Sequence, residues 1–379
     1  MTGGVCNAAD SMKQHRQIPS VSRRTASAAV GSRWRRPVIL EFPGSGNSYS
    51  DCFCQALAAE GAIVIGARYS GRWLLRNLMG ADYAHFHWPS FHYAASTMPA
   101  VLYKAVKFAA ILLLMRAFGV RIIWTAHNLY PHERNSPPWI DYAVRRMVVG
   151  LSDRVFVHGR TAGGILEREL GVDPDRVVSI AHGHFLDHYP MQATREEARL
   201  RLGLPLDKGV FAFIGHCRRY KNVTELVAAF QRDFHDSWLV IAGRCPDDAY
   251  RSEIEQLVRS RPDRILFEPR FIDDAELQFF IRAADAVVLP FRDVLTSGSA
   301  ILALSFGRPV VAPRIGNLVE VVNEEMGILY SVEDRNGLVN GMRAGLSRRF
   351  DQATIMRHVA SLRWQDAAAT VLAALRETG

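Results

Sequence analysis

The chain has 379 residues, of which 49% are hydrophobic and 22% are charged. These are globular values, and the length is too great for one small core, so we expect two domains of ordinary size or one large α/β unit. The formal net charge of +8 would suit a nucleic-acid-binding protein, but residues 1–36 hold seven Lys or Arg against one Asp and carry +6 of it. Because the remaining residues carry only +2, composition does not indicate a basic nucleic-acid-binding surface on the folded part.

Residues 1–36 are rich in Ser, Ala and Arg and show no sustained apolar period, so we predict a disordered basic tail. The same composition suits an organelle transit peptide, and that alternative stays open. The segment has no secretory apolar core, which predicts a reducing environment for the five cysteines. Cys52 and Cys54 lack a second pair at zinc-binding spacing, so we predict no metal site.

From residue 37 onward, short β-branched runs alternate with segments of helix length, which is the pattern of βαβ units around a parallel sheet. Turn residues and charges interrupt this alternation of strands and helices once, at the predicted linker. The predicted organisation of this α/β protein is a Rossmann-like unit at 37–184, a linker at 185–208, a second Rossmann-like unit at 209–340, and helices at 341–379 that could cross back to the first unit. The predicted strands are residues 37–42, 62–67, 83–88, 121–126, 154–159, 176–181, 210–215, 238–243, 264–269, 286–291 and 308–313.

The predicted helix at 99–119 is strongly apolar. Its longest uncharged run has eight residues, whereas crossing a bilayer takes about 20, so we expect no membrane span. Lys104, Lys107 and Arg116 interrupt the apolar surface, as in helices that insert shallowly into a membrane surface, and Leu112 and Leu113 would then be inserted. A helix that faces the core between two strands is an equal alternative.

The strand at 210–215 is followed by closely spaced cations. Gly215 ends the strand, and Arg218 and Lys221 precede the next helix. A glycine lets the backbone approach a ligand, a helix N-terminus supplies partial positive charge, and the two cations can neutralise phosphate oxygens. This turn predicts a diphosphate site, with a solvated basic turn as the alternative.

A second loop of this kind opens another helix in the same half. Thr296, Ser297, Gly298 and Ser299 precede a helical turn that carries no charge. Free backbone N–H groups and hydroxyl groups there can bind an anion without repulsion. Both loops follow strands of one parallel sheet, so we expect them at the same carboxyl edge. The alternative is that Ser297 or Ser299 only caps its own helix.

Candidate residues in the first half also follow predicted strands. Gly44 and Gly46 permit a tight turn close to a ligand, and Asn47 adds a polar contact. His127 follows the strand at 121–126, where it could position a substrate hydroxyl group or act as a base. Taken alone, a histidine in such a place is more often a structural hydrogen-bonding group.

His85, His87 and Trp88 end the strand at 83–88. The two histidines could face the same side as metal ligands, but no third ligand is evident. Contact of an acceptor sugar with Trp88 and His87, or plain structural packing, is therefore the favoured interpretation.

These motifs resemble those of glycosyltransferases with the GT-B fold, and in particular of the GT4-like group. "FIGHCRRYKNVTELVAAF" is similar to the donor-diphosphate motif of that group, and "AADAVVLPFRDVLTSGSAILALSFGRPVVAPRIGNLVEVV" is similar to its donor-binding segment. "VVSIAHGHFLDHYP" resembles the entry to its linker, and "TAHN" resembles the strand end that carries an active-site histidine. The resemblance covers roughly residues 37–365.

The resemblance implies two Rossmann-like domains that face a central cleft, and a metal-independent hexosyltransferase without a cofactor. Its donor would be a nucleotide sugar, such as a GDP- or UDP-linked hexose, whose diphosphate is held by Gly215, Arg218, Lys221 and residues 296–299. His127 would lie at the reacting centre. The acceptor would be a glycan or a lipid-linked sugar bound by the first half, as in polysaccharide or glycoconjugate synthesis.

One departure concerns two glutamates that the group usually carries eight residues apart. With the segment registered on Gly307, Val294 and Leu302 stand at those positions. Asp293 and Glu320 are the acidic candidates for replacing their contacts with the donor sugar or ribose. The missing pair leaves retention or inversion at the sugar open.

Two other functions stay open. A nucleotide-sugar 2-epimerase shares this architecture and donor site, and a nucleic-acid-binding protein would use the basic tail at 1–36. For the glycosyltransferase we expect a cytoplasmic location, with peripheral contact of residues 99–119 at the inner face of the membrane and no nucleic-acid partner.

Overall fold

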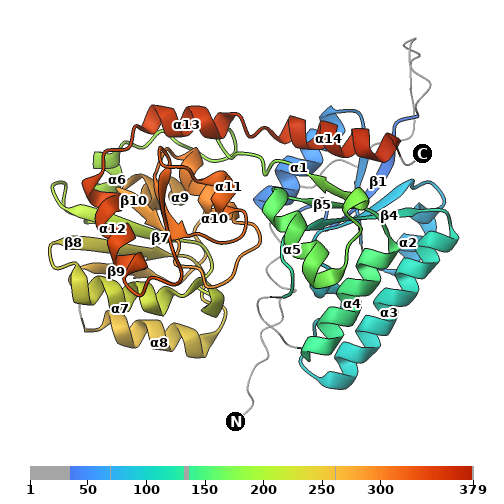
Figure 1. Ribbon diagram of the computed structural model, residues 1–379, viewed down its shortest axis with the longest axis horizontal. Helices are drawn as coiled ribbons and strands as arrows, with labels where there is room; N and C mark the ends of the chain where they lie inside the picture. Colours follow the sequence, from blue (N-terminus) through green and yellow to red (C-terminus); the bar gives the residue numbers. More distant parts are fainter. Residues whose placement is uncertain (1–34, 69, 132–135, 261, 378–379) are drawn as a thin grey trace.

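Two parallel sheets of six strands each organise the protein, as a computed structural model shows (Figure 1). The structure describes residues 35–68, 70–131, 136–260 and 262–377. The predicted α/β fold with two Rossmann-like sheets is confirmed. The predicted tail at 1–36 falls outside the described residues except for Arg35 and Arg36.

The first sheet has the strand order β2-β1-β3-β4-β5-β6. The chain adds β2 on one side of β1 and β3 on the other, so the order reverses between β1 and β3. Such a switch point leaves a crevice at the carboxyl ends of the strands, where ligands bind in open α/β sheets. The strands are β1 (Val38–Phe42), β2 (Ile63–Gly66), β3 (Tyr83–Phe86), β4 (Arg121–Ala126), β5 (Ser152–Val157) and β6 (Val177–Ser179).

The second sheet has the order β12-β11-β10-β7-β8-β9, with its switch point between β7 and β10. The sequence predicted all of its strands except β12, an edge strand in which three of four residues are only half-buried. The strands are β7 (Gly209–Ile214), β8 (Ser237–Ala242), β9 (Ile265–Glu268), β10 (Ala286–Val288), β11 (Val310–Pro313) and β12 (Gly327–Tyr330).

Helices cover both faces of each sheet and bury its apolar side chains. The helices of the first half are α1 (Ser48–Ala59), α2 (Gly71–Leu78), α3 (Met98–Ala117), α4 (Pro138–Leu151) and α5 (Arg160–Leu170), with short 3₁₀ turns η2 (Pro89–His92) and η3 (Pro174–Arg176). The later helices are α6 (Arg195–Arg201), α7 (Val223–Asp233), α8 (Asp248–Val258), α9 (Asp274–Arg282), α10 (Gly298–Ser305), α11 (Leu318–Val321), α12 (Gly337–Ser347), α13 (Gln352–Ala360) and α14 (Trp364–Arg376), with the 3₁₀ turn η4 (Arg219–Lys221).

The apolar helix α3 has one face in the core and one face in solvent. By length and composition it is the one helix among the described residues that could cross a bilayer, and 22% of that stretch is buried in the protein. Its buried face packs on β4 and α4, so α3 is part of the first half's core. The buried side chains of α3 are Val101, Phe108, Leu112 and Met115. The exposed large apolar side chains on α3 and its C-cap are Met98, Leu102, Tyr103, Val106, Leu113, Leu114 and Phe118.

The last helix, α14, packs on the first half. Figure 1 shows α13 above the second half and α14 above the first, so the chain crosses between them near residue 362. α14 lies against α1 and β5, where its buried residues complete the core on that face of the first sheet. The indole N–H of Trp364 donates to the His184 carbonyl at 2.6 Å. The ring lies so close to Gly183 that a Cβ atom there would stand 2.0 Å from it.

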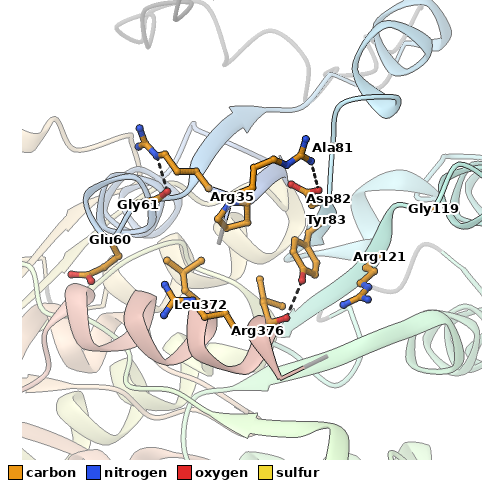
Figure 2. Close-up of a pocket in the computed structure, with 13 residues that line it drawn as sticks. Arg35, Glu60, Gly61, Ala81, Asp82, Tyr83, Gly119, Arg121, Leu372 and Arg376 are labelled. Carbon is orange, nitrogen blue, oxygen red and sulfur yellow. Dashed lines mark hydrogen bonds and ion pairs between the residues drawn. The ribbon is translucent and has the colours of Figure 1, made fainter. Parts of the chain in front are cut away.

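A cavity of about 730 Å³ lies beside the end of α14, where β1, β3 and β4 begin (Figure 2). The Arg35 guanidinium forms an ion pair with Asp82 at 2.6 Å, and Asp82 also accepts a hydrogen bond from the backbone of Val38 at 2.8 Å. The Tyr83 hydroxyl donates to the Leu375 carbonyl at 3.0 Å. Because these contacts join α14 to the amino edge of the sheet, this cavity lies at the edge opposite the carboxyl-end crevice.

We expect Trp364→Ala to destabilise the first half, because Trp364 is 6% exposed and ties α14 to the segment after β6. Truncation of a buried Trp costs about 3–5 kcal/mol. Trp139, which is 60% exposed on α4, is the matched control, and Trp139→Ala should change stability by no more than about 0.5 kcal/mol. Thermal unfolding of the two variants checks this, and equal melting temperatures would contradict the assigned role of α14.

Candidate functional site

The two loops that the sequence singled out in the second half meet at its switch point. Gly215, at the end of β7, has a φ of 126°. A Cβ atom on Gly215 would lie 3.0 Å from the Lys221 Nζ and 3.2 Å from the Ser299 Oγ. A backbone, an ammonium group and a hydroxyl group therefore surround one small space, and only glycine combines this φ with room for a ligand.

Lys221 gives this space its positive charge. Its Nζ lies 5.8 Å and 5.6 Å from the ring centres of Phe213 and Phe291. Among the described residues it has no carboxylate partner. Burial and then repulsion from Arg218 lower the pKa of Lys221 to about 8. An ammonium group held against aromatic rings without a counter-ion is stabilised by an incoming anion.

The neighbouring cation Arg219 has a structural role. Its guanidinium donates to Asp247 at 3.0 Å and to Glu253 at 2.8 Å. Arg218 and Lys221 stay the predicted diphosphate-binding cations of this turn.

The loop before α10 divides its polar groups between folding and binding. The Ser297 hydroxyl accepts a hydrogen bond from the Ala300 N–H at 3.2 Å, and the Ser297 N–H donates to Asn317 at 3.3 Å. The capping alternative therefore describes Ser297. The Thr296 hydroxyl oxygen is buried and has no hydrogen-bond partner among the described residues. An unpaired buried hydroxyl is a candidate for contact with a ligand, as is the Ser299 hydroxyl beside Gly215.

Glu320, predicted as a weak ligand for the donor sugar or ribose, joins the two halves. Its carboxylate accepts hydrogen bonds from the backbone N–H groups of Arg160 at 2.9 Å and Thr161 at 2.6 Å, at the N-terminus of α5. Burial opposes ionisation, but the hydrogen bonds from Thr161 and Arg160 hold the pKa of Glu320 below its usual value. In this structure the carboxylate therefore caps α5. To bind the donor sugar or ribose, Glu320 would first have to break these two hydrogen bonds.

The two positions of the usual glutamate pair also lie in apolar surroundings in the structure. Val294 lies in the core of the second half, and Leu302 packs against that core. Asp293 is exposed, one residue before the buried Val294. The structure therefore places no carboxylate at either of the two registered positions.

In the first half, the loop after β1 is shaped by two glycines. A Cβ atom on Gly44 would stand 2.3 Å from the Gly66 Cα, and Gly46 has a φ of 101°. The Asn47 side chain accepts from the Ser50 N–H at 2.9 Å and caps α1. Asn47 therefore has a structural role, while the two glycines bring the loop close to its neighbour.

Five histidines lie in or just after the carboxyl ends of β3, β4, β5 and β6. Side chains two apart on a strand share a face. Ile39, Tyr83, Ile123 and Phe156 pack toward α1 and α14, so the groups two or four positions further along face the same side. We call His85, His87, His127, His158 and His182 the histidine row; each is at most 6% exposed.

Glu41, which is fully buried on β1, anchors one end of the row. Its two carboxylate oxygens lie 2.9 Å from His85 Nδ1 and 2.9 Å from His87 Nε2. His85 Nε2 continues to the Thr125 hydroxyl at 2.8 Å, and His87 Nδ1 continues to His127 Nε2 at 3.1 Å. The network therefore runs from Thr125 through the carboxylate to His127.

Burial lowers the pKa of four members of the row, His87, His127, His158 and His182. Burial lowers the pKa of His87 to about 4 and that of His182 to about 4. Burial and the neighbouring histidines hold the pKa of His127 well below its usual value. Burial opposes ionisation of Glu41, but His85 and then the hydrogen bonds lower its pKa to about 2. The Glu41 carboxylate is therefore ionised at neutral pH, whereas His127 is neutral and able to accept a proton.

Glu41, His85 and His87 offer ligand atoms within 4.8 Å of one another, close enough for one metal ion. However, both carboxylate oxygens and all four ring nitrogens of this group already have hydrogen-bond partners at 2.8 to 3.1 Å. These hydrogen bonds occupy the donor atoms in this structure. Glu41 is the third group beside the two histidines that the sequence did not reveal.

His127 lies at the solvent side of this network. Its ring stacks on Trp88 with centroids 4.4 Å apart, and Tyr49 meets it edge-on at 4.5 Å. His87, predicted as a weak acceptor ligand, is 1% exposed with both ring nitrogens engaged, so it supports His127 from behind. Trp88 is partly exposed and keeps the role of an acceptor contact.

The histidine row reaches the second half at the loop before α10. The rings of His158 and His182 are 5.0 Å apart. A Cβ atom on Gly298 would lie 3.5 Å from His182 Nε2. One continuous site therefore extends from Glu41 in the first sheet to the phosphate-type loops of the second.

The sequence reasoning missed Glu41, Tyr49, His158 and His182. Two signals could have found three of them. Glu41 is the one charged residue in an otherwise apolar strand, and "HFHW", "TAHN", "FVHG" and "IAHG" each place a histidine at or just after a strand end. Tyr49 gives no such signal, since it lies on α1 among ordinary helix residues.

Comparison with known proteins gives the following relatives. The family model described as "Glycosyl transferases group 1" matches residues 208–348. A GDP-mannose:glycolipid 4-beta-D-mannosyltransferase of Xanthomonas campestris pv. campestris is 29% identical over 268 residues, 69% of this chain and 70% of that protein. A D-inositol 3-phosphate glycosyltransferase of Xylanimonas cellulosilytica is 32% identical over 240 residues, 59% of this chain and 57% of that protein.

Solved structures show the same fold. Sucrose-phosphate synthase from Thermosynechococcus elongatus superposes with a TM-score of 0.69 at 22% identity, covering 91% of this chain and 99% of its own. At this identity the likeness concerns the arrangement of the two sheets.

Because the pKa of Lys221 is about 8, we expect pyrophosphate binding to weaken as the pH rises from 7 to 9. Loss of the Lys221 proton should reduce affinity about tenfold over this range. Lys221→Arg keeps its charge throughout and corrects for the ionisation of pyrophosphate itself. Isothermal titration calorimetry checks this, and parallel pH curves for the two proteins would contradict the assignment of Lys221.

Proposed function

Since the chain belongs to the group 1 glycosyltransferases with the GT-B fold, we propose that it transfers mannose from GDP-mannose to a hydroxyl group of a glycolipid acceptor. The observation that carries this proposal is the contact between the two loops at Gly215, Lys221 and Ser299, which opens toward the histidine row. The proposed sugar and acceptor are those in the name of the Xanthomonas relative.

The second half would hold the donor. Lys221 and Arg218 face the diphosphate and stabilise the negative charge that develops on it as the sugar leaves. Backbone N–H groups at the N-terminus of α10, with the hydroxyl groups of Thr296 and Ser299, add hydrogen bonds to phosphate or sugar. This arrangement supplies positive charge where other transferases use a metal ion.

The first half would hold the acceptor. Trp88 offers an aromatic face beside His127, and sugars bind such faces through their apolar C–H surface. His127 then removes the proton of the attacking hydroxyl group. The bond from the sugar carbon to the acceptor oxygen forms as the bond to the diphosphate breaks, and the diphosphate leaves with the electron pair.

We further propose that the reaction inverts the sugar carbon. GDP-mannose carries its sugar in the α configuration, whereas the name of the Xanthomonas relative describes a β-linked product. Direct displacement with a histidine base gives this outcome. Val294 and Leu302, at the positions of the usual glutamates, leave the donor sugar without the acidic contacts of the retaining group.

A second proposal concerns the membrane. Tyr103, Val106 and Leu113 are 69%, 69% and 57% exposed along one side of α3, where their spacing of three and seven residues forms a stripe. Lys104 and Lys107 flank this stripe, which suits a surface of anionic lipid head groups. A glycolipid acceptor would then be taken directly from the membrane.

A screen of nucleotide sugars by thermal shift tests the donor. We expect GDP-mannose to raise the melting temperature most among GDP-, UDP- and ADP-linked hexoses. Lys221→Ala and Arg218→Ala should each lower kcat/KM by about 10²-fold, because each removes charge stabilisation of the leaving group. Arg219→Ala is the matched control and should keep its activity, since its partners are Asp247 and Glu253.

The same preparation separates the alternatives. Incubated with GDP-mannose and no acceptor, a transferase leaves the configuration of the sugar unchanged, whereas a 2-epimerase alters it. Unchanged turnover in both Lys221→Ala and Arg218→Ala would overturn the donor site.

Flotation with vesicles that contain anionic phospholipid tests the membrane proposal. We expect Val106→Glu and Leu113→Glu to abolish co-flotation, because each puts a charge into the inserted stripe. Leu112, which the sequence placed among the inserted residues, is fully buried and belongs to the core, so that expectation is wrong. Leu200→Glu, at 69% exposure in the second half, is the matched control and should float like the unmodified protein.

A further inference from the structure

We propose that Glu41 is a positioning residue for the transfer reaction, acting through His87 to fix the tautomer of His127 and to compensate the positive charge that His127 acquires. The inference rests on the proposed function and assigns a role to two buried residues behind the reacting centre. It follows from the direction of each hydrogen bond in the network.

The carboxylate fixes these directions. Ionised Glu41 can only accept, so His87 Nε2, at 2.9 Å, must carry the proton and donate. A neutral His87 then presents a lone pair at Nδ1, which accepts from His127 Nε2 at 3.1 Å. A neutral His127 that donates through Nε2 has its own lone pair at Nδ1. Among the described residues no group is bonded to that Nδ1 atom, so it is available to an acceptor hydroxyl.

The second arm of the network holds the carboxylate still. His85 binds the other oxygen of Glu41 at 2.9 Å and is itself fixed by Thr125 at 2.8 Å. All of these side chains are fully buried. Rotation of the carboxylate would break two hydrogen bonds at once, so one oxygen stays directed at His87.

The charge on His127 needs a partner. The ring is surrounded by Tyr49, Trp88, His87 and His158, none of which is negatively charged. Within the described part of the chain, Glu41 is the one carboxylate that is hydrogen bonded to the histidine row. An unpaired imidazolium in so buried a site is strongly disfavoured.

The proton transfer balances within this relay. The acceptor hydroxyl proton moves to His127 Nδ1 as the acceptor oxygen bonds to the sugar carbon. The proton on His127 Nε2 can move to His87 Nδ1, which leaves His127 neutral and places an imidazolium ion directly beside the Glu41 carboxylate. The proton returns to solvent through His127 after GDP departs with its electron pair. The positive charge thus ends on His87, one hydrogen bond away from His127, where the Glu41 carboxylate stabilises it.

Glu41→Gln is the decisive variant. An amide keeps the size of the side chain but removes its charge, and its NH₂ group can donate to His87 Nε2. His87 would then donate from Nδ1, and His127 would hold its proton on Nδ1 and lose its function as a base. We expect kcat to fall by about 10²- to 10⁴-fold, with the donor affinity unchanged because the donor site lies in the other half.

Asp141→Asn is the matched control, because Asp141 is a second fully buried carboxylate of the first half. It accepts hydrogen bonds from Tyr93 at 2.8 Å and Ser136 at 2.6 Å, and no hydrogen bond between it and the histidine row occurs in the described part of the chain. We expect Asp141→Asn to lower thermal stability but to keep the kcat and its pH profile. Glu41→Asp, which retains the charge, should restore part of the lost kcat.

The tautomer gives a readout that does not depend on turnover. In protein labelled with ¹⁵N-histidine, the His127 signals, assigned by their loss in His127→Gln, should show the proton on Nε2 in the unmodified chain and on Nδ1 in Glu41→Gln. If Glu41→Gln does not fold, His87→Gln breaks the same relay and should show the same loss of kcat.

The outcomes are distinguishable. A kcat for Glu41→Gln within threefold of the unmodified protein, an equal loss in Asp141→Asn, or a His127 proton on Nδ1 in the unmodified chain would each overturn the relay. Absence of any turnover in the unmodified protein would instead overturn the proposed function, and the tautomer measurement would still decide the role of Glu41.

Discussion

A single ionised carboxylate without solvent contact constrains much of the first half. Glu41 can remain charged at 0% exposure because two histidines donate to it, and a buried charge without such donors would be costly. Those donors come from β3, which is paired with β1 so that Glu41 stands opposite His85. The pairing of β3 with β4 in turn brings Thr125 and His127 within reach. The strand order β1-β3-β4 and the polar network therefore require each other.

The two halves bring opposite electrostatic properties to the shared crevice. The second sheet presents an ammonium group whose positive charge lacks a carboxylate partner among the described residues. The first sheet presents His127, which burial and the neighbouring histidines keep neutral. A leaving diphosphate needs positive charge, and an attacking hydroxyl group needs a neutral base, so the division suits displacement at a sugar carbon. Both sheets are parallel and both have a switch point, which is why the two sets of groups can face one another.

The strands were predictable from sequence because buried parallel strands are continuous apolar runs, and eleven of the twelve described strands fall on such runs. The phosphate-type loops were predictable because glycine, hydroxyl groups and cations stood at strand ends. Three other features depended on tertiary contacts. The partner of Glu320 lies some 160 residues away, at Arg160. The inner face of α3, with Leu112, could not be told from its outer face, with Leu113, because the run Phe108–Met115 carries no polar residue. The function of Glu41 depended on the neighbours of β1.

The crossing of α14 has a consequence for how the chain folds during synthesis. The face of the first sheet that carries α1 stays partly uncovered until residues 364–376 arrive. Before that point the ribosome must complete the second sheet, whose strands span residues 209–330. The first half therefore completes its core only after the second half has been synthesised, although the first half is synthesised first. A protein cut short before α14 would present an open apolar face to chaperones and proteases, even though both sheets were already formed.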